Sequence, residues 1–267
     1  MMAVFTKLNK NEIEEFINQY EIGKLDDYNE IIEGIENTNY KIICDGVPYI
    51  LTIFEKRVNE KELPFFIDLK LFLSRKNFKC PKPIENKNNE IINSIKNKKA
   101  VIISYIKGYK VELPNMKECF EVGKMIGELH NLSQDFEKKR INSLEINELK
   151  KIFNKCLDSQ KEELKEIINE LTNELKFLET SMPKNIPSGI IHADLFKDNI
   201  FFSKEKIAGV IDFYFSCFYF YIYDISIVIN DWCFDNQGLN FNKDFFYSII
   251  EGYKLSRNLE NAENEAF

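Results

Sequence analysis

The sequence has few of the residues that build metal centres and disulfide frameworks. Its 267 residues include only two histidines, and its six cysteines are scattered without a C-x-x-C pair. Structural zinc sites need clustered Cys and His ligands, and small secreted domains are stapled by paired cysteines. We therefore expect reduced thiols, with neither a zinc site nor a disulfide framework.

An excess of positive charge and a long apolar run are also missing. The formal net charge is −7, with 36 Lys and Arg against 43 Asp and Glu, whereas nucleic-acid surfaces need basic residues in clustered excess. The most apolar stretch, residues 213–229, is interrupted by Asp224 and falls short of the ~20 apolar residues that span a bilayer. The first residues lack a signal peptide's basic start and apolar run. We expect a cytoplasmic protein with no nucleic-acid or membrane partner.

Local patterns in the first hundred residues predict a β-rich unit. Apolar residues within 9–20 have the i, i+3, i+4, i+7 spacing of an amphipathic helix. Asp45-Gly46 tolerates the positive φ angles of a type I′ turn, so residues 40–44 and 47–54 are predicted to form a hairpin. Asn59 and Glu62 have capping-box spacing at the start of a helix that runs to about Lys76. A nearly all-apolar strand is predicted over residues 100–106.

The rest of the chain is mainly helical by pattern. Helices are expected from about Asn115, over residues 145–180 as a pair, near 221–235 and over 242–254, with short strands at 189–191, 200–202 and 207–213. The resulting fold class is α+β. It has two lobes: a β-rich N-terminal lobe, residues 1–105, and a mainly helical C-terminal lobe, residues 106–267.

Two polar blocks that follow apolar strands carry the chemical information. The first is His192-Ala-Asp-Leu-Phe-Lys-Asp-Asn199, and the second is Ile211-Asp-Phe213. Phosphoryl transfer from ATP needs an aspartate that orients the attacking hydroxyl and further oxygen ligands for Mg²⁺. Asp194, Asn199 and Asp212 supply these groups, and the five-residue interval from Asp194 to Asn199 equals that of the kinase catalytic loop. Either block alone is commonly accidental, whereas the two in order favour an ATP-dependent kinase.

These blocks, the pair Leu129-His130 and the order of the lobes resemble the aminoglycoside phosphotransferase and choline kinase superfamily of protein-kinase-like folds. Within that superfamily, the chain resembles the bacterial homoserine kinase family from residue 2 to about 259. The segments that carry this resemblance are residues 34–40, 49–56, 62–66, 80–83, 223–224 and 230–235.

The resemblance implies a small-molecule substrate and two cofactors, ATP and Mg²⁺. A homoserine kinase moves the γ-phosphoryl group of ATP to the homoserine hydroxyl and yields O-phospho-L-homoserine for threonine biosynthesis. By this resemblance Asp194 is the catalytic base or hydroxyl-orienting group, and Asn199 and Asp212 are the magnesium ligands. His192 organises the loop and is not an acid or base, because phosphoryl transfer needs no histidine in that role.

Further site residues follow from the same resemblance. Asp224 matches the aspartate that braces the catalytic loop by accepting its backbone N–H groups. The implied nucleotide contacts are Asn37, Thr38 and Asn39 around the phosphates, and backbone groups of Ser104 and Ile106 beside the adenine. Asn230, Asp231 and Trp232 are candidates for binding the amino-acid substrate, with a plain helix face and a core tryptophan as the alternative.

The chain departs from the kinase pattern at one position. The third strand of the kinase fold ordinarily carries Lys or Arg for the phosphates, whereas Thr52 stands there. Lys56 or Arg57 at the strand's end, or Lys41 on the facing strand, are substitutes, and each is equally explained as a solvated charge. Glu62, the candidate ion-pair partner, is equally explained as a capping residue.

Two other functions remain open from the sequence. One is a kinase of the same superfamily that acts on choline, ethanolamine or an aminoglycoside, since aromatic residues between 213 and 223 would suit a quaternary ammonium. The other is a pseudokinase that only binds, suggested by Thr52 and opposed by the presence of Asp194, Asn199 and Asp212. Members of the family extend past the point matched by residues 251–253, so we expect a C-terminal lobe that is incomplete. The sequence leaves the oligomeric state open.

Overall fold

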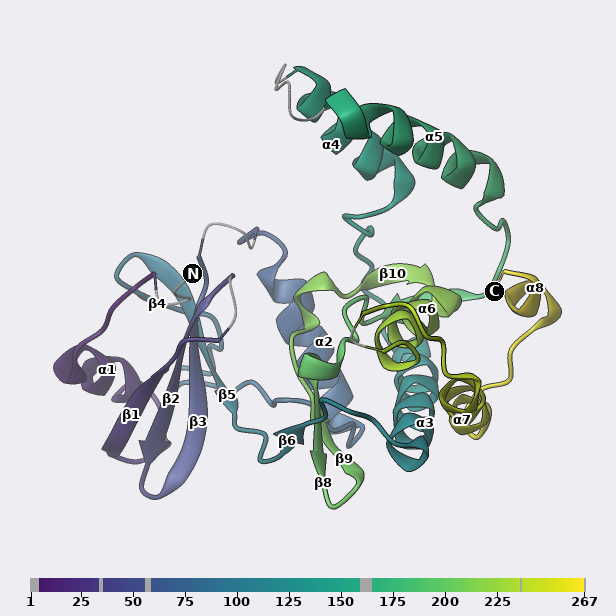
Figure 1. Cartoon of the computed structure of the whole chain (residues 1–267). Helices are drawn as coiled ribbons and strands as arrows, with labels where there is room; N and C mark the ends of the chain where they lie inside the picture. The colour runs from purple at the N-terminus through teal and green to yellow at the C-terminus, as the bar shows by residue number, and fades with distance from the viewer. Residues whose placement is uncertain (1–4, 34–35, 56–58, 159–164, 236, 267) are drawn as a thin grey trace.

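The N-terminal part of the chain forms a five-stranded antiparallel sheet (Figure 1). The computed structural model describes residues 5–33, 36–55, 59–158, 165–235 and 237–266. Strand order in the sheet is β1-β2-β3-β5-β4, and helix α1 packs at its side. The elements are α1 (Lys10–Ile17), β1 (Leu25–Ile31), β2 (Thr38–Cys44), β3 (Val47–Ile53), β4 (Asn93–Ile95) and β5 (Lys98–Ser104).

The predicted hairpin is confirmed. Cys44 pairs with Val47 across the turn between β2 and β3, and the two turn residues, Asp45 and Gly46, have φ angles of 45° and 77°. Because both angles are positive, the turn has the type I′ twist that matches antiparallel strands. The hairpin fixes which face of β2 and β3 each side chain occupies, since side chains alternate along a strand.

Helix α2 (Leu63–Arg75) begins later than the sequence pattern indicates. Its N-cap is Glu62, whose side chain makes no capping hydrogen bond, so the capping-box prediction for Asn59 and Glu62 is wrong. Pro64 occupies the first turn, where its missing N–H leaves no helical bond unmade, and this favours a start at residue 63.

Helix α2 also joins the two lobes through its buried residues. Phe66, Leu69 and Leu73 belong to the main core of the helical lobe, while Leu63 and Ile67 belong to a smaller cluster with the sheet residues Phe54 and Val101. One helix thereby contributes to the core of the helical lobe and to a smaller cluster against the sheet.

The helical lobe is built on close packing of α3 against α7 (Figure 1). A Cβ atom added at Gly123 would lie 1.9 Å from the carbonyl oxygen of Ile249, and one at Gly252 would lie 2.0 Å from that of Phe120. Two glycines therefore let the helix backbones approach each other. The helices are α3 (Met116–Leu132), α4 (Ile146–Asp158), α5 (Lys165–Ser181), α6 (Tyr221–Trp232), α7 (Lys243–Lys254) and α8 (Asn261–Glu265).

Short strands place the two polar blocks at the junction of the lobes. Strand β7 (Ser188–Ile191) pairs with β10 (Cys217–Phe220), and a second small sheet has the order β6-β8-β9. Residues 192–199 connect β7 to β8, and Asp212 follows β9, as the sequence predicts. The remaining short elements are β6 (Tyr109–Lys110), β8 (Ile200–Ser203), β9 (Lys206–Val210), η1 (Ser133–Asp135), η3 (Lys197–Asn199) and η4 (Phe213–Phe215).

The α4–α5 pair stands away from the rest of the helical lobe in Figure 1. In the described ranges, no helix is both long and apolar enough to cross a membrane.

Candidate active site

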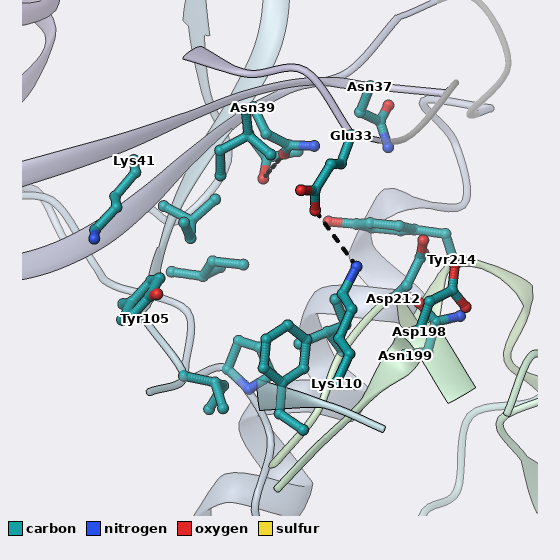
Figure 2. A pocket seen from close by; sticks show the side chains of 18 of the residues that line it. Glu33, Asn37, Asn39, Lys41, Tyr105, Lys110, Asp198, Asn199, Asp212 and Tyr214 are labelled. Carbon is teal, nitrogen blue, oxygen red and sulfur yellow. Dashed lines mark hydrogen bonds and ion pairs between the residues drawn. The ribbon is translucent and has the colours of Figure 1, made fainter. Parts of the chain in front are cut away.

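A cavity of about 1250 Å³ lies where the sheet, β6 and the two polar blocks meet. Figure 2 shows Lys41 and Tyr105 at one end of it, and Asn199, Asp212 and Tyr214 at the other. Clefts with apolar walls and a few convergent polar groups are the usual place for small-molecule sites. Asp194, Asn199 and Asp212 all line it, so the structure brings together the three residues predicted to carry chemistry.

The side chain of Asn199 holds Asp194 in place. Its Nδ2 donates to the backbone oxygen of Asp194 and to the Oδ2 atom of the same residue, each over 2.8 Å. Burial raises the pKa of Asp194 to about 6, with the Asp212 charge adding to the rise. Asp194 is therefore ionised at pH 7, oriented, and able to accept a hydrogen bond from a hydroxyl group.

Asp212 has the backbone conformation of a strained functional position. Its φ and ψ are 62° and 61°, in the left-handed region, which costs a non-glycine residue of order 1 kcal/mol or more. Its Oδ1 atom is buried, and no hydrogen-bond partner for it exists in the described part of the chain. Burial first, and then the charge of Glu36, raise the pKa of Asp212 to about 6. A carboxylate oxygen that is buried without a partner is suited to accept a cation.

The donor set around Asp212 fits Mg²⁺. Among the described residues there is no group of three or more His, Cys, Asp or Glu able to hold a metal by themselves. Mg²⁺ in phosphoryl-transfer sites is bound by one or two carboxylates together with the phosphates of the substrate. Asp212, the amide oxygen of Asn199 and a nucleotide make such a set.

Asp224 and His192 support the loop that carries Asp194. The carboxylate of Asp224 is fully buried and accepts from the backbone N–H groups of His192 and Ala193 over 2.8 and 2.6 Å. Burial lowers the pKa of His192, so its Nε2–H donates to the Ile211 carbonyl 2.9 Å away. This bond ties the Asp194 loop to the residue before Asp212.

Of the three residues predicted around the phosphates, two face the cavity. Asn37 and Asn39 line it, whereas Thr38 does not. Thr38 is fully buried on the other face of the sheet, where its Oγ1 accepts from the backbone N–H groups of Phe5 and Thr6 and donates to Glu55. The prediction for Thr38 is corrected on geometric grounds, because alternate residues of a strand point to opposite faces.

The predicted adenine position lies at the other end of the cavity. Ser104 and Ile106 both line it, with Tyr105 between them. The ammonium of Lys41 lies 4.8 Å from the centre of the Tyr105 ring, and Figure 2 shows both at the end remote from Asp212. Lys41 is therefore far from the predicted phosphate position. Lys56 and Arg57, the other substitutes for the missing cation, lie outside the described residues.

Lys70, on α2, lies in the site although no pattern in the sequence predicted it there. Its side chain lines the cavity although the residue is only 2% exposed, and its Nζ donates to the hydroxyl of Tyr214 over 3.3 Å. Burial lowers the pKa of Lys70 to about 8, and the charges of Cys80 and Asp212 oppose that change. No carboxylate within the described ranges lies at ion-pair distance from it. Lys70 lies three residues before Leu73, three after Ile67 and four after Phe66, so it interrupts an apolar helix face. That interruption was the signal available in the sequence.

Helix α6, whose first turn contains Asp224, contributes less to the cavity than predicted. Asp231 lines it, accepts from the backbone N–H of Lys197 over 2.6 Å and lies 3.7 Å from the Lys197 ammonium. Asn230 is exposed outside the cavity. Trp232 is fully buried in the core, with its ring 6.1 Å from that of Phe202. The substrate-binding prediction is therefore corrected for Asn230 and Trp232.

Glu62 makes no side-chain capping hydrogen bond, and its ion-pair partner among the described residues is Arg140. Glu62 accepts from Nε of Arg140 over 2.6 Å, and Arg140 also donates to the backbone carbonyls of Phe215 and Ser216. The pair thus joins the start of α2 to the segment after Asp212, across the junction of the lobes.

Comparison with known proteins places this geometry in a family. Residues 27–252 match the profile of the phosphotransferase enzyme family. A homoserine kinase of Agrobacterium fabrum strain C58 is 39% identical over 265 residues, which is 99% of this chain and 82% of that protein. A homoserine kinase of Bartonella henselae is 37% identical over 99% of this chain and 83% of its own length.

Solved structures with the same fold are more distant in sequence. The amicoumacin kinase hAmiN, in complex with AMP-PNP, Ca²⁺ and its ligand, superposes with a TM-score of 0.72 at 18% identity, over 96% of this chain and 80% of that one. A microcompartment-associated aminopropanol kinase gives 0.70 at 16% identity, over 96% and 83%. By its sequence matches, this chain belongs to the phosphotransferase enzyme family and, within it, to the family of the homoserine kinases.

Proposed function

We propose that this protein is an ATP-dependent homoserine kinase that forms O-phospho-L-homoserine for threonine biosynthesis. The observation that carries the proposal is the identity of 39% to a homoserine kinase over 99% of this chain. The site agrees with it, since an ionised aspartate, an asparagine and a second aspartate line one cavity, as phosphoryl transfer from ATP requires.

In the proposed reaction Asp194 accepts a hydrogen bond from the homoserine hydroxyl and then its proton. The hydroxyl oxygen forms a bond to the γ-phosphorus, the bond from that phosphorus to the bridging oxygen of ATP breaks, and ADP leaves with the bond's electron pair. The two bonds from Asn199 Nδ2 keep the carboxylate in one orientation, which reduces the entropy cost of reaching the reactive geometry.

We propose Asp212 and Asn199 as the residues that hold Mg²⁺. Bound with the nucleotide, the cation would offset negative charge on the transferring phosphoryl group. The support is the buried Oδ1 atom of Asp212, which has no hydrogen-bond partner among the described residues, together with the absence of a larger ligand cluster in the same part of the chain.

The nucleotide is proposed to extend along the cavity. Its adenine would lie beside Ser104 and Ile106, and its phosphates beneath Asn37 and Asn39, which project from the sheet. We propose that Lys70 supplies the cation that the third strand lacks. In kinases that cation is a strand lysine paired with a glutamate of the next helix, whereas here the strand carries Thr52 and the next helix carries Lys70.

The substrate end of the cavity is proposed to include Asp231, as the carboxylate that meets the amino group of homoserine. It lies 3.7 Å from the ammonium of Lys197, which we propose as the cation that meets the substrate carboxylate. We also propose the boundary between the lobes at residues 105 and 106, and action in the cytoplasm, where the six free cysteines stay reduced.

A panel of acceptor alcohols tests the function. Consumption of ATP with Mg²⁺ would be measured with homoserine, choline, ethanolamine, serine, threonine and kanamycin, for the parent protein and for Asp194→Asn. We expect turnover of homoserine alone, lost in Asp194→Asn and kept in the surface variant Asp135→Asn. Turnover of choline or kanamycin without homoserine would contradict the proposal. No turnover at all, with no effect of Mg·ATP on the melting temperature, would favour a binding module.

A further inference from the structure

A buried chain of hydrogen bonds connects the Asp194 loop to the end of the described chain. His130 Nε2 lies 3.2 Å from Asp224 Oδ2, and His130 Nδ1 lies 2.9 Å from the hydroxyl of Tyr253. Arg257 Nη1 donates to that hydroxyl over 2.9 Å, and its guanidinium meets Glu263 through two bonds of 2.9 Å each. Asp224, His130, Tyr253 and Glu263 are fully buried.

The positions of the protons along this chain of hydrogen bonds follow from the chemistry of its groups. Burial lowers the pKa of His130, so its ring is neutral and has one N–H. Asp224 already accepts from two backbone N–H groups and offers only acceptors, so the N–H of His130 must be at Nε2. Nδ1 then carries a lone pair and accepts from the Tyr253 hydroxyl, whose oxygen in turn accepts from Arg257. Between Arg257 and Asp224, each hydrogen bond therefore has its donor on the Arg257 side.

The far end of the chain is anchored by charge. Two parallel bonds between a guanidinium and a carboxylate are among the stronger contacts of their kind, and this pair is buried, with side-chain exposures of 10% for Arg257 and 0% for Glu263. The ring of Tyr221 lies 4.5 Å from both the Arg257 guanidinium and the His130 ring. Helices α3, α6, α7 and α8 thus each contribute one residue to this chain of hydrogen bonds.

The near end of the chain acts on a strained residue. Ala193, directly before Asp194, has a φ of 65°, a left-handed conformation that an alanine adopts only when its surroundings enforce it. The bond of 2.6 Å from Ala193 N–H to Asp224 Oδ1 enforces it here. Any shift of the Asp224 carboxylate would consequently change where Asp194 points.

We propose that Tyr253, Arg257 and Glu263 are positioning residues for the phosphoryl transfer, acting on Asp194 through His130 and Asp224. This inference rests on the proposed function, because Asp194 must be the group that orients the hydroxyl. None of the three residues lines the cavity, so their loss changes the rate of the chemical step and leaves the binding of substrates unchanged.

Kinetics of three variants test the inference. Tyr253→Phe removes one hydroxyl, and Glu263→Gln removes the anchoring charge with little change in size. We expect kcat to fall about tenfold or more in Tyr253→Phe and about threefold in Glu263→Gln, with both KM values within about threefold of the parent. Because Tyr253→Phe already disconnects Glu263, the double variant should have the kcat of Tyr253→Phe, whereas independent defects would multiply.

A matched control and a binding assay separate positioning from loss of folded protein. Tyr247→Phe changes the same atom on the same helix at a residue that is 59% exposed, and it should retain the parent kcat. Titration with AMP-PNP gives the fraction of competent molecules, and kcat is expressed per competent molecule. A kcat for Tyr253→Phe within twofold of the parent on this basis would overturn the inference, as would multiplicative effects in the double variant.

The imidazole resonances give a readout that does not need homoserine. The chain has two histidines, so ¹⁵N spectra of the ring nitrogens are simple to assign with His130→Asn. We expect His130 to be protonated at Nε2 in the parent protein and its Nδ1 shift to change in Tyr253→Phe. Protonation at Nδ1 in the parent would overturn the inference. If homoserine is not a substrate, the proposed function fails and kcat cannot be measured with it. The ¹⁵N spectra would still show whether the chain of hydrogen bonds from Tyr253 to Asp224 exists.

Discussion

The ammonium of Lys70 lies 3.3 Å from the hydroxyl of Tyr214. The Tyr214 ring packs edge-on against Phe54 and Phe66, with distances between ring centres of 5.3 and 5.5 Å. Among the described residues, this buried ammonium contacts the hydroxyl and the ring of Tyr214 and has no carboxylate at ion-pair distance. It can therefore form a new ionic bond in the cavity without breaking one of those. This relationship supports the proposal that Lys70 replaces the cation missing at Thr52.

Lys70→Met should lower kcat/KM for ATP by about 10- to 100-fold, the range expected for loss of one charged hydrogen bond of roughly 1.5–3 kcal/mol. Lys41→Met is the matched control, because Lys41 lies at the Tyr105 end of the same cavity. Steady-state kinetics with varied ATP check the prediction. A larger loss for Lys41→Met than for Lys70→Met would contradict it.

Asp212→Asn should stabilise the protein at pH 7 when metal is absent. Burial raises the pKa of Asp212 from 3.8 to about 6, so between about pH 4 and 6 the folded state holds more protons than the unfolded state. Stability therefore falls as pH rises through that window and stays lower at pH 7. We expect a gain of up to about 2 kcal/mol in the free energy of unfolding at pH 7, and almost none at pH 4.

Urea unfolding in EDTA at pH 4, 5, 6 and 7 measures this effect. The exposed change Asp135→Asn should leave the pH dependence as it is in the parent. A variant Asp212→Asn that is less stable than the parent at pH 7 would mean that the carboxylate has partners not seen in the structure.

Asp224→Asn should lower kcat by about 100-fold or more while AMP-PNP still binds. An amide has one acceptor oxygen where the carboxylate accepts from His192, Ala193 and His130, so at least one buried donor loses its partner. Turnover and AMP-PNP affinity, measured on the same preparation, check the prediction. The variant Asp244→Asn, which affects the first turn of α7, should retain kcat, and a similar loss there would argue against a specific effect.

Gly123→Ala should be among the most destabilising small substitutions in the chain. The new Cβ would lie 1.9 Å from the carbonyl oxygen of Ile249, so α3 and α7 must separate, and overpacking of this kind costs about 1–3 kcal/mol or more. Gly238→Ala is the control, since it has open space around it despite a φ of 70°, and should cost about 1 kcal/mol. The loss of unfolding free energy in each variant is measured from its denaturant midpoint. Equal losses in Gly123→Ala and Gly238→Ala would contradict the packing explanation.

Local chemistry in the sequence was enough to predict the hairpin, the longer helices and the residues at the centre of the candidate site. The positive φ angles of Asp45 and Gly46 depend only on which residues tolerate them, so the hairpin was predictable. The contact between Asp194 and Asn199 spans five residues within one loop, and a fixed spacing in a short loop fixes a distance. Asp212 was identified in the same way, from its place directly after a strand.

The tertiary structure decided which side chains face the cavity. Thr38 was expected beside Asn37 and Asn39, but the strand period of two turns it into the sheet's other face, where Phe5, Thr6 and Glu55 meet it. Trp232 follows Asp231 directly, and the rotation of about 100° per residue along a helix takes it into the core. Thr38 and Trp232 could each occupy a cavity face or a core face as far as local sequence is concerned. The packing of the whole molecule decides which face each one occupies.

Long-range partners were equally invisible in the sequence. Lys70 lines the same cavity as Asp212 because α2 packs its apolar residues into the core of the helical lobe and against the sheet. Glu62 finds Arg140, and His130 joins Asp224 to Tyr253, 123 residues further along the chain. Spacing along the chain encodes contacts within a turn or a loop, whereas contacts between distant segments exist only once burial of apolar surface has brought those segments together.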